Sequence, residues 1–235
     1  MNIQYVSDVH TEFHHDGGKT WARALERRAD VLVLAGDIGT TRNLYEVIAI
    51  LCKRFEHVVH VNGNHEYYGA DRGYVNRMHR KLSARYPNYH HLNNREVTIN
   101  GQRFVGTTLW WTGQPEEMRY FLNDYNCITG YRKWIKQAHC DAVDFLTRTD
   151  LTDAVVVTHH LPSYQLRPET TEPNMLDPAY YNNLDHLLEG VKVWVHGHTH
   201  ERYDVVLHDT RVVTFACGYA KHGRSDWYGL VDLTT

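Results

Sequence analysis

Metal-binding side chains recur at five places in this 235-residue chain, each directly after a short apolar run. The five segments are Asp8-Val9-His10, Gly36-Asp37, Gly63-Asn64-His65-Glu66, His159-His160 and Gly197-His198-Thr199-His200. Aspartate, asparagine and histidine supply the mixed oxygen and nitrogen ligands that suit two borderline divalent cations sharing a carboxylate. A surface turn explains one such segment equally well, but five in order at strand ends predict a dinuclear metal centre.

Short apolar strands alternate with amphipathic helices, and this order must position the five segments. The continuous apolar run Val31–Ala35 indicates a strand that is covered on both faces. Strands are expected at Ile3–Val6, Val31–Ala35, Val58–Val61, Glu96–Ile99, Arg103–Leu109, Ala154–Thr158, Val191–Val195, Tyr203–Leu207, Arg211–Phe215 and Tyr228–Leu233. Helices are expected at Trp21–Arg28, Leu44–Phe55, Tyr74–Tyr86, Trp134–Leu146 and Tyr180–Leu188. The pattern predicts one layered α/β domain over residues 1–235, with mixed sheets.

Composition sets limits on the class of protein. Hydrophobic residues make up 42% of the chain, and the net charge is −3, so no overall positive field favours nucleic acid. The apolar runs are far shorter than the roughly 20 residues that a membrane-spanning helix needs. The four cysteines are far apart, which is typical of buried thiols in a reducing compartment. Because the first strand begins almost at Met1, we expect no signal peptide and a cytoplasmic location.

Taken together, the five segments resemble the signature of the calcineurin-like metallophosphoesterase superfamily. That signature is Asp-x-His, Gly-Asp, Gly-Asn-His-Asp/Glu, a lone histidine after a strand, and Gly-His-x-His. All five blocks occur here in order, between residues 8 and 200. Within the superfamily the chain looks most like the small bacterial and phage phosphoesterases. The resemblance implies a four-layer αββα sandwich of two mixed β-sheets flanked by helices, with the metals at the strand ends.

The resemblance also implies which residues bind two divalent ions. One ion would be held by Asp8, His10 and His200. The other would be held by Asn64, His159 and His198, and Asp37 would bridge the two ions. His159 is preferred to His160 because it directly follows the expected strand. Histidine, aspartate and asparagine ligands suit manganese, iron, zinc or nickel, and the resemblance favours manganese or iron.

The implied activity is hydrolysis of a phosphate ester, with a small or nucleotide-like phosphodiester favoured. Two divalent ions bring four positive charges, and Asp8, Asp37 and a bridging hydroxide return three, so one positive charge remains to attract phosphate. Metal coordination lowers the pKa of water towards ~7, which makes hydroxide available at neutral pH. The hydroxide would attack phosphorus in line. His65, left over once the ligands are assigned, would protonate the leaving oxygen as a general acid.

One departure from the family pattern concerns the partner of His65. Protein phosphatases of the superfamily carry Gly-Asp-x-x-Asp-Arg-Gly, but here Thr40 replaces the second aspartate and Arg42 falls one residue late. Either Glu66 or a more distant residue must then orient His65. The departure weakens a protein phosphatase interpretation. Phosphomonoesterase and nuclease activities on the same metal core remain alternatives, as does a non-catalytic binding scaffold, which metal content would distinguish.

Four further side chains are candidates for substrate contact. Trp110 and Trp111 begin a long irregular region, and aromatic walls of this kind stack bases in single-stranded nucleic-acid sites. Packing in the core explains such residues more often. His160 adjoins a predicted ligand, and Arg202 follows His200 closely enough to hold a distal anion, with surface solvation as the alternative.

Overall fold

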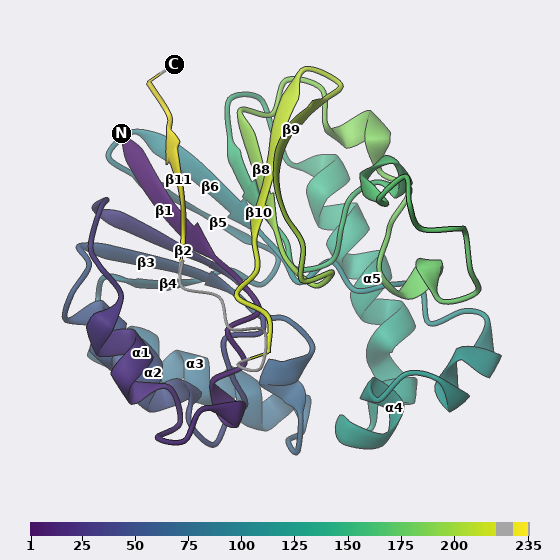
Figure 1. Ribbon diagram of the computed structural model, residues 1–235, viewed down its shortest axis with the longest axis horizontal. Helices are drawn as coiled ribbons and strands as arrows, with labels where there is room; N and C mark the ends of the chain where they lie inside the picture. Colours follow the sequence, from purple (N-terminus) through teal and green to yellow (C-terminus); the bar gives the residue numbers. More distant parts are fainter. Residues whose placement is uncertain (220–227, 235) are drawn as a thin grey trace.

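The computed structural model describes residues 1–219 and 228–234, and these form four layers (Figure 1). Two β-sheets pack face to face. Helices α1, α2 and α3 lie on the outer face of one sheet, and α5 lies on the outer face of the other (Figure 1). The helices span Lys19–Ala24 (α1), Leu44–Cys52 (α2), Arg72–Arg85 (α3), Asp124–Cys127 (α4) and Tyr131–Arg148 (α5). The αββα sandwich predicted from the sequence is therefore confirmed.

Within the described residues, the first sheet contains five strands in the order β11-β1-β2-β3-β4. Strands β1 to β4 run parallel, and β11 pairs antiparallel with β1 at the edge. The strands span Asn2–Val6 (β1), Val31–Ala35 (β2), His57–Val61 (β3), Tyr89–His91 (β4) and Gly229–Asp232 (β11). Because parallel strands share one direction, the carboxyl ends of β1, β2 and β3 meet at one edge of this sheet.

The second sheet contains six strands in the order β5-β6-β7-β8-β10-β9 over the same part of the chain. Strands β6, β7, β8 and β10 are parallel, while β5 and β9 pair antiparallel at the two edges. The strands span Arg95–Ile99 (β5), Gln102–Gly106 (β6), Val155–Val157 (β7), Val193–His196 (β8), Arg202–Leu207 (β9) and Thr210–Phe215 (β10). Both sheets are therefore mixed, as predicted.

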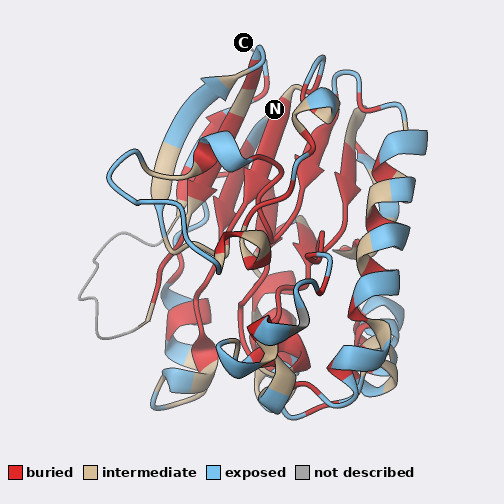
Figure 2. Ribbon diagram, turned by 90° about the vertical axis from the view of Figure 1, so that its right-hand side faces the viewer, coloured by how far each residue is buried: buried red, intermediate tan, exposed pale blue. Residues whose placement is uncertain are grey.

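Strand β2 shows why a continuous apolar run is needed in this fold. Val31, Val33 and Ala35 point between the two sheets, whereas Leu32 and Leu34 point to the layer of α1, α2 and α3. All five side chains are fully buried. Figure 2 shows the same division over the molecule, with buried strands inside and exposed outer faces on the helices. The sheets thus form a rigid, dry frame for the loops that follow them.

The helix predicted at Tyr180–Leu188 is absent from the described structure, and that prediction is wrong. The segment instead forms an isolated bridge between Tyr181 and Leu161, followed by a short 3-10 turn at Asp185–Leu187. The Asn182 side chain donates to the carbonyl oxygen of Leu161 at 3.2 Å. Pairing with a distant segment has overridden the local apolar spacing that favoured a helix.

Two other differences concern short elements. Helix α1 stops at Ala24 instead of continuing to Arg28, because Leu25 leaves the helical region with ψ at 113°. Strand β4, at the edge of the first sheet, was not predicted; it is three residues long and rich in histidine, so its sequence carries no clear strand signal. Across the described residues, no helix has the length and apolarity needed to cross a bilayer.

Candidate metal centre

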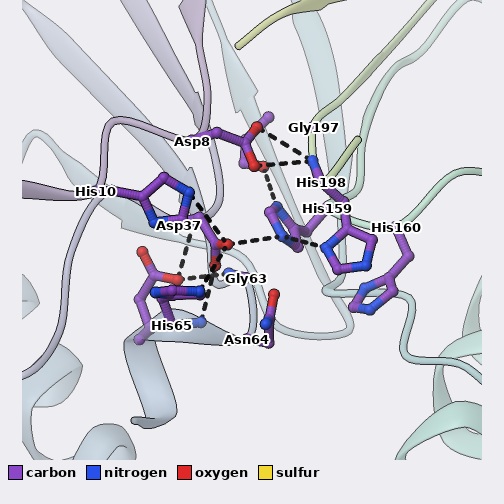
Figure 3. Close-up of polar contacts among 12 residues, drawn as sticks. Asp8, His10, Asp37, Gly63, Asn64, His65, His159, His160, Gly197 and His198 are labelled. Carbon is purple, nitrogen blue, oxygen red and sulfur yellow. Dashed lines mark hydrogen bonds and ion pairs between the residues drawn. The ribbon is translucent and has the colours of Figure 1, made fainter. Parts of the chain in front are cut away.

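Five parallel strands end where the predicted metal-binding segments begin. Asp8, Asp37 and Asn64 follow β1, β2 and β3 of the first sheet, and His159 and His198 follow β7 and β8 of the second. Figure 3 shows these side chains converging from the two sheets on one small volume. Ligands of open α/β sheets collect at the carboxyl ends of the strands, and here two such edges face each other.

The first group of converging side chains contains Asp8, His10 and His200. The Nε2 atoms of His10 and His200 lie 2.9 Å apart, and Nε2 of His200 lies 3.4 Å from Oδ1 of Asp8. Asp8 and His10 are fully buried. Two imidazole nitrogens and a carboxylate oxygen aimed at one point form a suitable set of ligands for one divalent cation.

The second group contains Asp37, His159 and His198. Nε2 of His159 lies 3.4 Å from Oδ2 of Asp37 and 3.2 Å from Nδ1 of His198. Oδ2 of Asp37 is also 3.9 Å from Nε2 of His10, a member of the first group. Asp37 therefore lies between the two groups, as Figure 3 shows, where a carboxylate that bridges two ions is expected.

Asn64 provides a direct test of whether the site fits a metal. Its Oδ1 is buried and has no hydrogen-bond partner among the described residues, and leaving such an atom unpaired is costly. Its Nδ2 donates to Oδ1 of Asp124 at 2.9 Å, which fixes the orientation of the amide. The free oxygen is thus the atom available to a cation, and the residues present fit a divalent metal pair.

The glycines of the motifs are required by close approach to these ligands. A Cβ atom on Gly63 would lie 2.2 Å from Oδ1 of Asp37. A Cβ on Gly36, whose φ is +90°, would lie 2.3 Å from Nδ1 of His159. Any larger residue would displace a predicted ligand, so Gly-Asp and Gly-Asn are steric requirements of the centre.

Backbone carbonyls select which nitrogen of each histidine faces the centre. Nδ1 of His159 lies 2.9 Å from the carbonyl oxygen of Ala35, which leaves its Nε2 for the centre. Nε2 of His198 lies 3.2 Å from the carbonyl oxygen of Ala179, which leaves its Nδ1. Partners of this kind fix the tautomer and ring orientation of metal-binding histidines. His160 lies outside both groups, which supports the choice of His159 as ligand.

Glu12 is the carboxylate that orients His65, and sequence reasoning did not find it. Oε1 of Glu12 lies 2.6 Å from Nδ1 of His65 and 3.4 Å from Nδ1 of His10. Burial opposes the charge on Glu12, but the hydrogen bonds with His10 and His65 lower its pKa to about 2. Burial likewise opposes a charged His65, yet Asp37 and Glu12 raise the pKa of His65 to about 9. Glu12 and His65 thus form a hydrogen-bonded carboxylate–imidazole pair next to the centre.

Glu66, which the sequence offered as the other possible partner of His65, instead connects two loops. Its carboxylate accepts hydrogen bonds from the backbone N–H groups of Asp37 at 3.0 Å, Ile38 at 2.8 Å and Gly63 at 2.7 Å. It therefore ties together the loops that follow β2 and β3. The sequence signal that could have identified Glu12 is its position two residues after His10, just beyond the first motif.

The sequence model of the calcineurin-like phosphoesterase family matches residues 1–202. The chain belongs to this family. An uncharacterized protein of Acanthamoeba polyphaga mimivirus is 23% identical over 274 residues, covering 98% of this chain and 96% of the viral protein. A phosphoester hydrolase of this family is metal-dependent, and the two groups of side chains described above are the candidate sites for the metals.

Solved structures share the fold at low sequence identity. The Mycobacterium tuberculosis phosphopantetheinyl hydrolase superposes with a TM-score of 0.77 at 18% identity, covering 98% of this chain and 95% of its own. A Thermus thermophilus protein gives a TM-score of 0.66 at 15% identity, covering 99% and 94%. These likenesses show that the fold is shared over the whole sandwich.

A cavity of about 830 Å³ opens beside the predicted ligands of this phosphoesterase. Asp37, Asn64, His65, His198 and His200 line its floor. Its walls are mainly aromatic or apolar and include Phe13, Tyr68, Phe121, Leu122, Tyr180 and Tyr219. The cavity thus combines polar, candidate metal-binding side chains with an aromatic and apolar surface.

The structure corrects the four predicted substrate contacts, because none of them lines this cavity. Trp110 and Trp111 are 4% and 1% exposed and belong to the hydrophobic cluster around α5. His160 is fully buried behind His198, with 4.2 Å between ring centroids. Arg202 lies over the ring of Phe215 at 4.0 Å. Trp110 and Trp111 are buried because large aromatic side chains gain stability from packing in a hydrophobic core.

Asp124 is a second residue that sequence reasoning missed, and it comes from the long irregular region. Its Oδ1 accepts hydrogen bonds from Asn64 and, at 2.8 Å, from the hydroxyl of Tyr68. The Tyr68 ring in turn stacks on His65, with centroids 4.1 Å apart. Asp124 therefore holds both a predicted ligand and the ring that packs on the predicted acid.

Replacing Asp124 with leucine is expected to weaken binding of the second manganese ion by about 10- to 100-fold, the usual effect of losing a partner that orients a ligand. The Asn64 amide would then keep only its longer hydrogen bond to the Tyr68 hydroxyl, at 3.3 Å. Titration with Mn²⁺ followed by electron paramagnetic resonance measures each binding step. Asp124→Asn keeps an acceptor oxygen and should stay near wild type, as should the exposed control Asp141→Leu. Unchanged affinity in Asp124→Leu would contradict the role.

Proposed function

We propose that this protein hydrolyses phosphodiesters, using two divalent ions held by the seven predicted ligands and His65 as the acid. Manganese or iron is the proposed pair. The observation that carries the proposal is the convergence of two ligand groups on Asp37, with His65 3.9 Å from its Oδ2. His65 also forms a third group of converging side chains, with His10 and Asp37. The proposal assigns His10 and Asp37 to the metals and leaves His65 as the acid.

The charge of the cavity supports a diester over a monoester. Among its described lining residues there is no lysine or arginine, while Asp37 and Asp124 are both present. A monoester dianion is usually held by extra cations, whereas a diester carries one negative charge and two organic groups. An aromatic-lined cavity of about 830 Å³ suits the second kind of substrate.

When bound, a pair of divalent ions supplies Lewis acidity and lowers the pKa of water towards ~7. The remaining chemistry belongs to the side chains. Glu12 forms a hydrogen bond with Nδ1 of His65, so Nε2 is the nitrogen that faces the centre. Tyr68 packs on the ring and restricts its rotation. His65 is thereby positioned to give a proton to the oxygen of the leaving alcohol.

The proposal is tested by hydrolysis of bis-p-nitrophenyl phosphate and p-nitrophenyl phosphate, assayed side by side with Mn²⁺. We expect faster turnover of the diester, loss of turnover on chelation, and recovery when Mn²⁺ is restored. Parallel reloading with Fe²⁺, Zn²⁺ and Ni²⁺ tests the choice of metal. Nucleotide diesters and a phosphopantetheinyl ester, the latter suggested by the name of the M. tuberculosis neighbour, extend the substrate screen.

Other outcomes would change the function assigned. Faster turnover of the monoester would make the protein a phosphomonoesterase. No turnover of either ester, in a sample with two equivalents of metal, would favour a binding scaffold. Both results are measurable with the same samples, so the substrate preference and the presence of catalysis are decided separately.

A further inference from the structure

A second cavity, of about 660 Å³, adjoins the first at the predicted acid. Phe13, His65 and Tyr68 line both cavities. Four predicted metal ligands line the first cavity, namely Asp37, Asn64, His198 and His200, and none lines the second. The lining of the second cavity includes the polar residues Thr40, Arg42, Asn43 and Asn126. His65 thus lies where the two cavities meet.

The second cavity carries a positive charge at Arg42. Arg42 is exposed, and among the described residues no carboxylate forms an ion pair with it. The one acidic residue in the lining, Glu12, is already engaged by His10 and His65. An unpaired guanidinium beside a neutralised carboxylate makes the cavity attractive to an anion.

The start of α2 adds to this potential. Thr40, Arg42 and Asn43 form the turn that leads into α2, and the backbone N–H of Leu44 bonds to the carbonyl of Thr40 at 3.0 Å. The Asn43 side chain does not cap the helix; it donates to Thr11 instead. Because Thr40, Arg42 and Asn43 line the second cavity, the first turn of this nine-residue helix lies beside it, where the helix dipole favours an anion.

We propose that the second cavity binds the leaving alcohol of the substrate, and that Arg42 holds a second anionic group, such as a phosphate, on that alcohol. This inference rests on the phosphodiesterase function proposed above. The leaving oxygen must lie next to His65 to receive its proton, and His65 is the side chain at which the two cavities meet. The substrate class is a phosphodiester whose leaving alcohol is itself phosphorylated.

The test combines variants of Arg42 with two substrates that differ only in charge. One is the dinucleotide thymidylyl-thymidine, and the other is the same dinucleotide with phosphates at its 5′ and 3′ ends. Whichever ester bond breaks, the second substrate releases a phosphorylated alcohol. Arg42→Ala is expected to lower kcat/KM for the phosphorylated dinucleotide by about 10- to 100-fold, the effect of one charge-assisted hydrogen-bonding pair. The loss should lie mainly in KM, because the contact is remote from the reacting bond.

The unphosphorylated dinucleotide and bis-p-nitrophenyl phosphate should change less than about threefold in Arg42→Ala, since they lack the group that Arg42 holds. Arg42→Lys should recover part of the loss. Arg85→Ala, on an exposed arginine at the end of α3 that lines neither cavity, is the matched control. An equal loss on all substrates, no loss on the phosphorylated one, or the same loss in Arg85→Ala would overturn the inference.

Binding of a product gives a readout that does not depend on turnover. Isothermal titration calorimetry with thymidine 5′-monophosphate and thymidine 3′-monophosphate, the two alcohols that the phosphorylated dinucleotide can release, should show binding that weakens about 10- to 100-fold in Arg42→Ala. Equal binding by wild type and variant would contradict the subsite. If bis-p-nitrophenyl phosphate is not cleaved by the metal-loaded wild type, the proposed function fails, whereas loss of thymidine monophosphate binding in Arg42→Ala alone would still support an anion site at Arg42.

Discussion

Asp37→Asn is expected to lower kcat/KM for bis-p-nitrophenyl phosphate by about 10³-fold, equivalent to ~4 kcal/mol of transition-state stabilisation. The side chain lies between both groups of predicted ligands and is 2% exposed. Burial opposes its charge, but the neighbouring imidazoles of His159 and His65 hold the pKa of Asp37 well below its ordinary value. Asparagine removes the negative charge that two cations would share.

The substitution should spare the fold, which makes the result interpretable. Oδ1 of Asp37 accepts the backbone N–H of His65 at 2.8 Å, and the amide oxygen of asparagine can accept the same bond. Circular dichroism should therefore be unchanged, while the bound metal measured by mass spectrometry falls below two equivalents per chain. Asp144→Asn, the same change on the exposed side of α5, should retain full activity. Wild-type turnover in Asp37→Asn would exclude a bridging role.

The sequence allowed the predicted ligands to be located because each follows a strand directly. Asp8, Asp37 and His159 have no freedom to lie elsewhere once β1, β2 and β7 are parallel members of facing sheets. The apolar runs themselves predicted the sheets, since β2 is buried on both faces. Local pattern and overall topology agreed at these positions, and the prediction of the fold was correct for that reason.

The surroundings of the ligands could not be predicted in the same way. Asp124 reaches Asn64 across 60 positions of sequence, and Glu12 reaches His65 across 53. Such contacts depend on how loops fold over the strand ends, and no local periodicity encodes them. The pair Trp110-Trp111 shows the converse: aromatic residues beside a motif looked available to substrate but are required by the core around α5.

The missed strand and the false helix have one physical cause. A short segment follows its tertiary partners when the local preference is weak. Tyr181 pairs with Leu161 in spite of helical apolar spacing, and β4 joins β3 although three residues give almost no strand signal. Neither segment supplies a predicted ligand, so these errors leave the prediction of the metal centre unchanged.

His65→Ala is expected to lower turnover of thymidylyl-thymidine by about 10²- to 10⁴-fold, the usual contribution of a positioned general acid. The leaving alkoxide of that substrate is strongly basic and needs a proton in the transition state. The p-nitrophenolate of bis-p-nitrophenyl phosphate is a weak base, so its release should fall less than about tenfold in the same variant. The loss should therefore depend on the leaving group, which a purely structural role of His65 would not produce.

Glu12→Gln extends the argument to the residue that orients the acid. The neutral amide still accepts a hydrogen bond from Nδ1 of His65, but it no longer stabilises the imidazolium, since the 2.6 Å contact loses its charge. Turnover of thymidylyl-thymidine should fall by about 10- to 100-fold, less than in His65→Ala, as for other residues that orient a ligand or acid. The exposed control His186→Ala should behave as wild type. Equal losses on both leaving groups, in either variant, would assign His65 and Glu12 to binding instead of proton transfer.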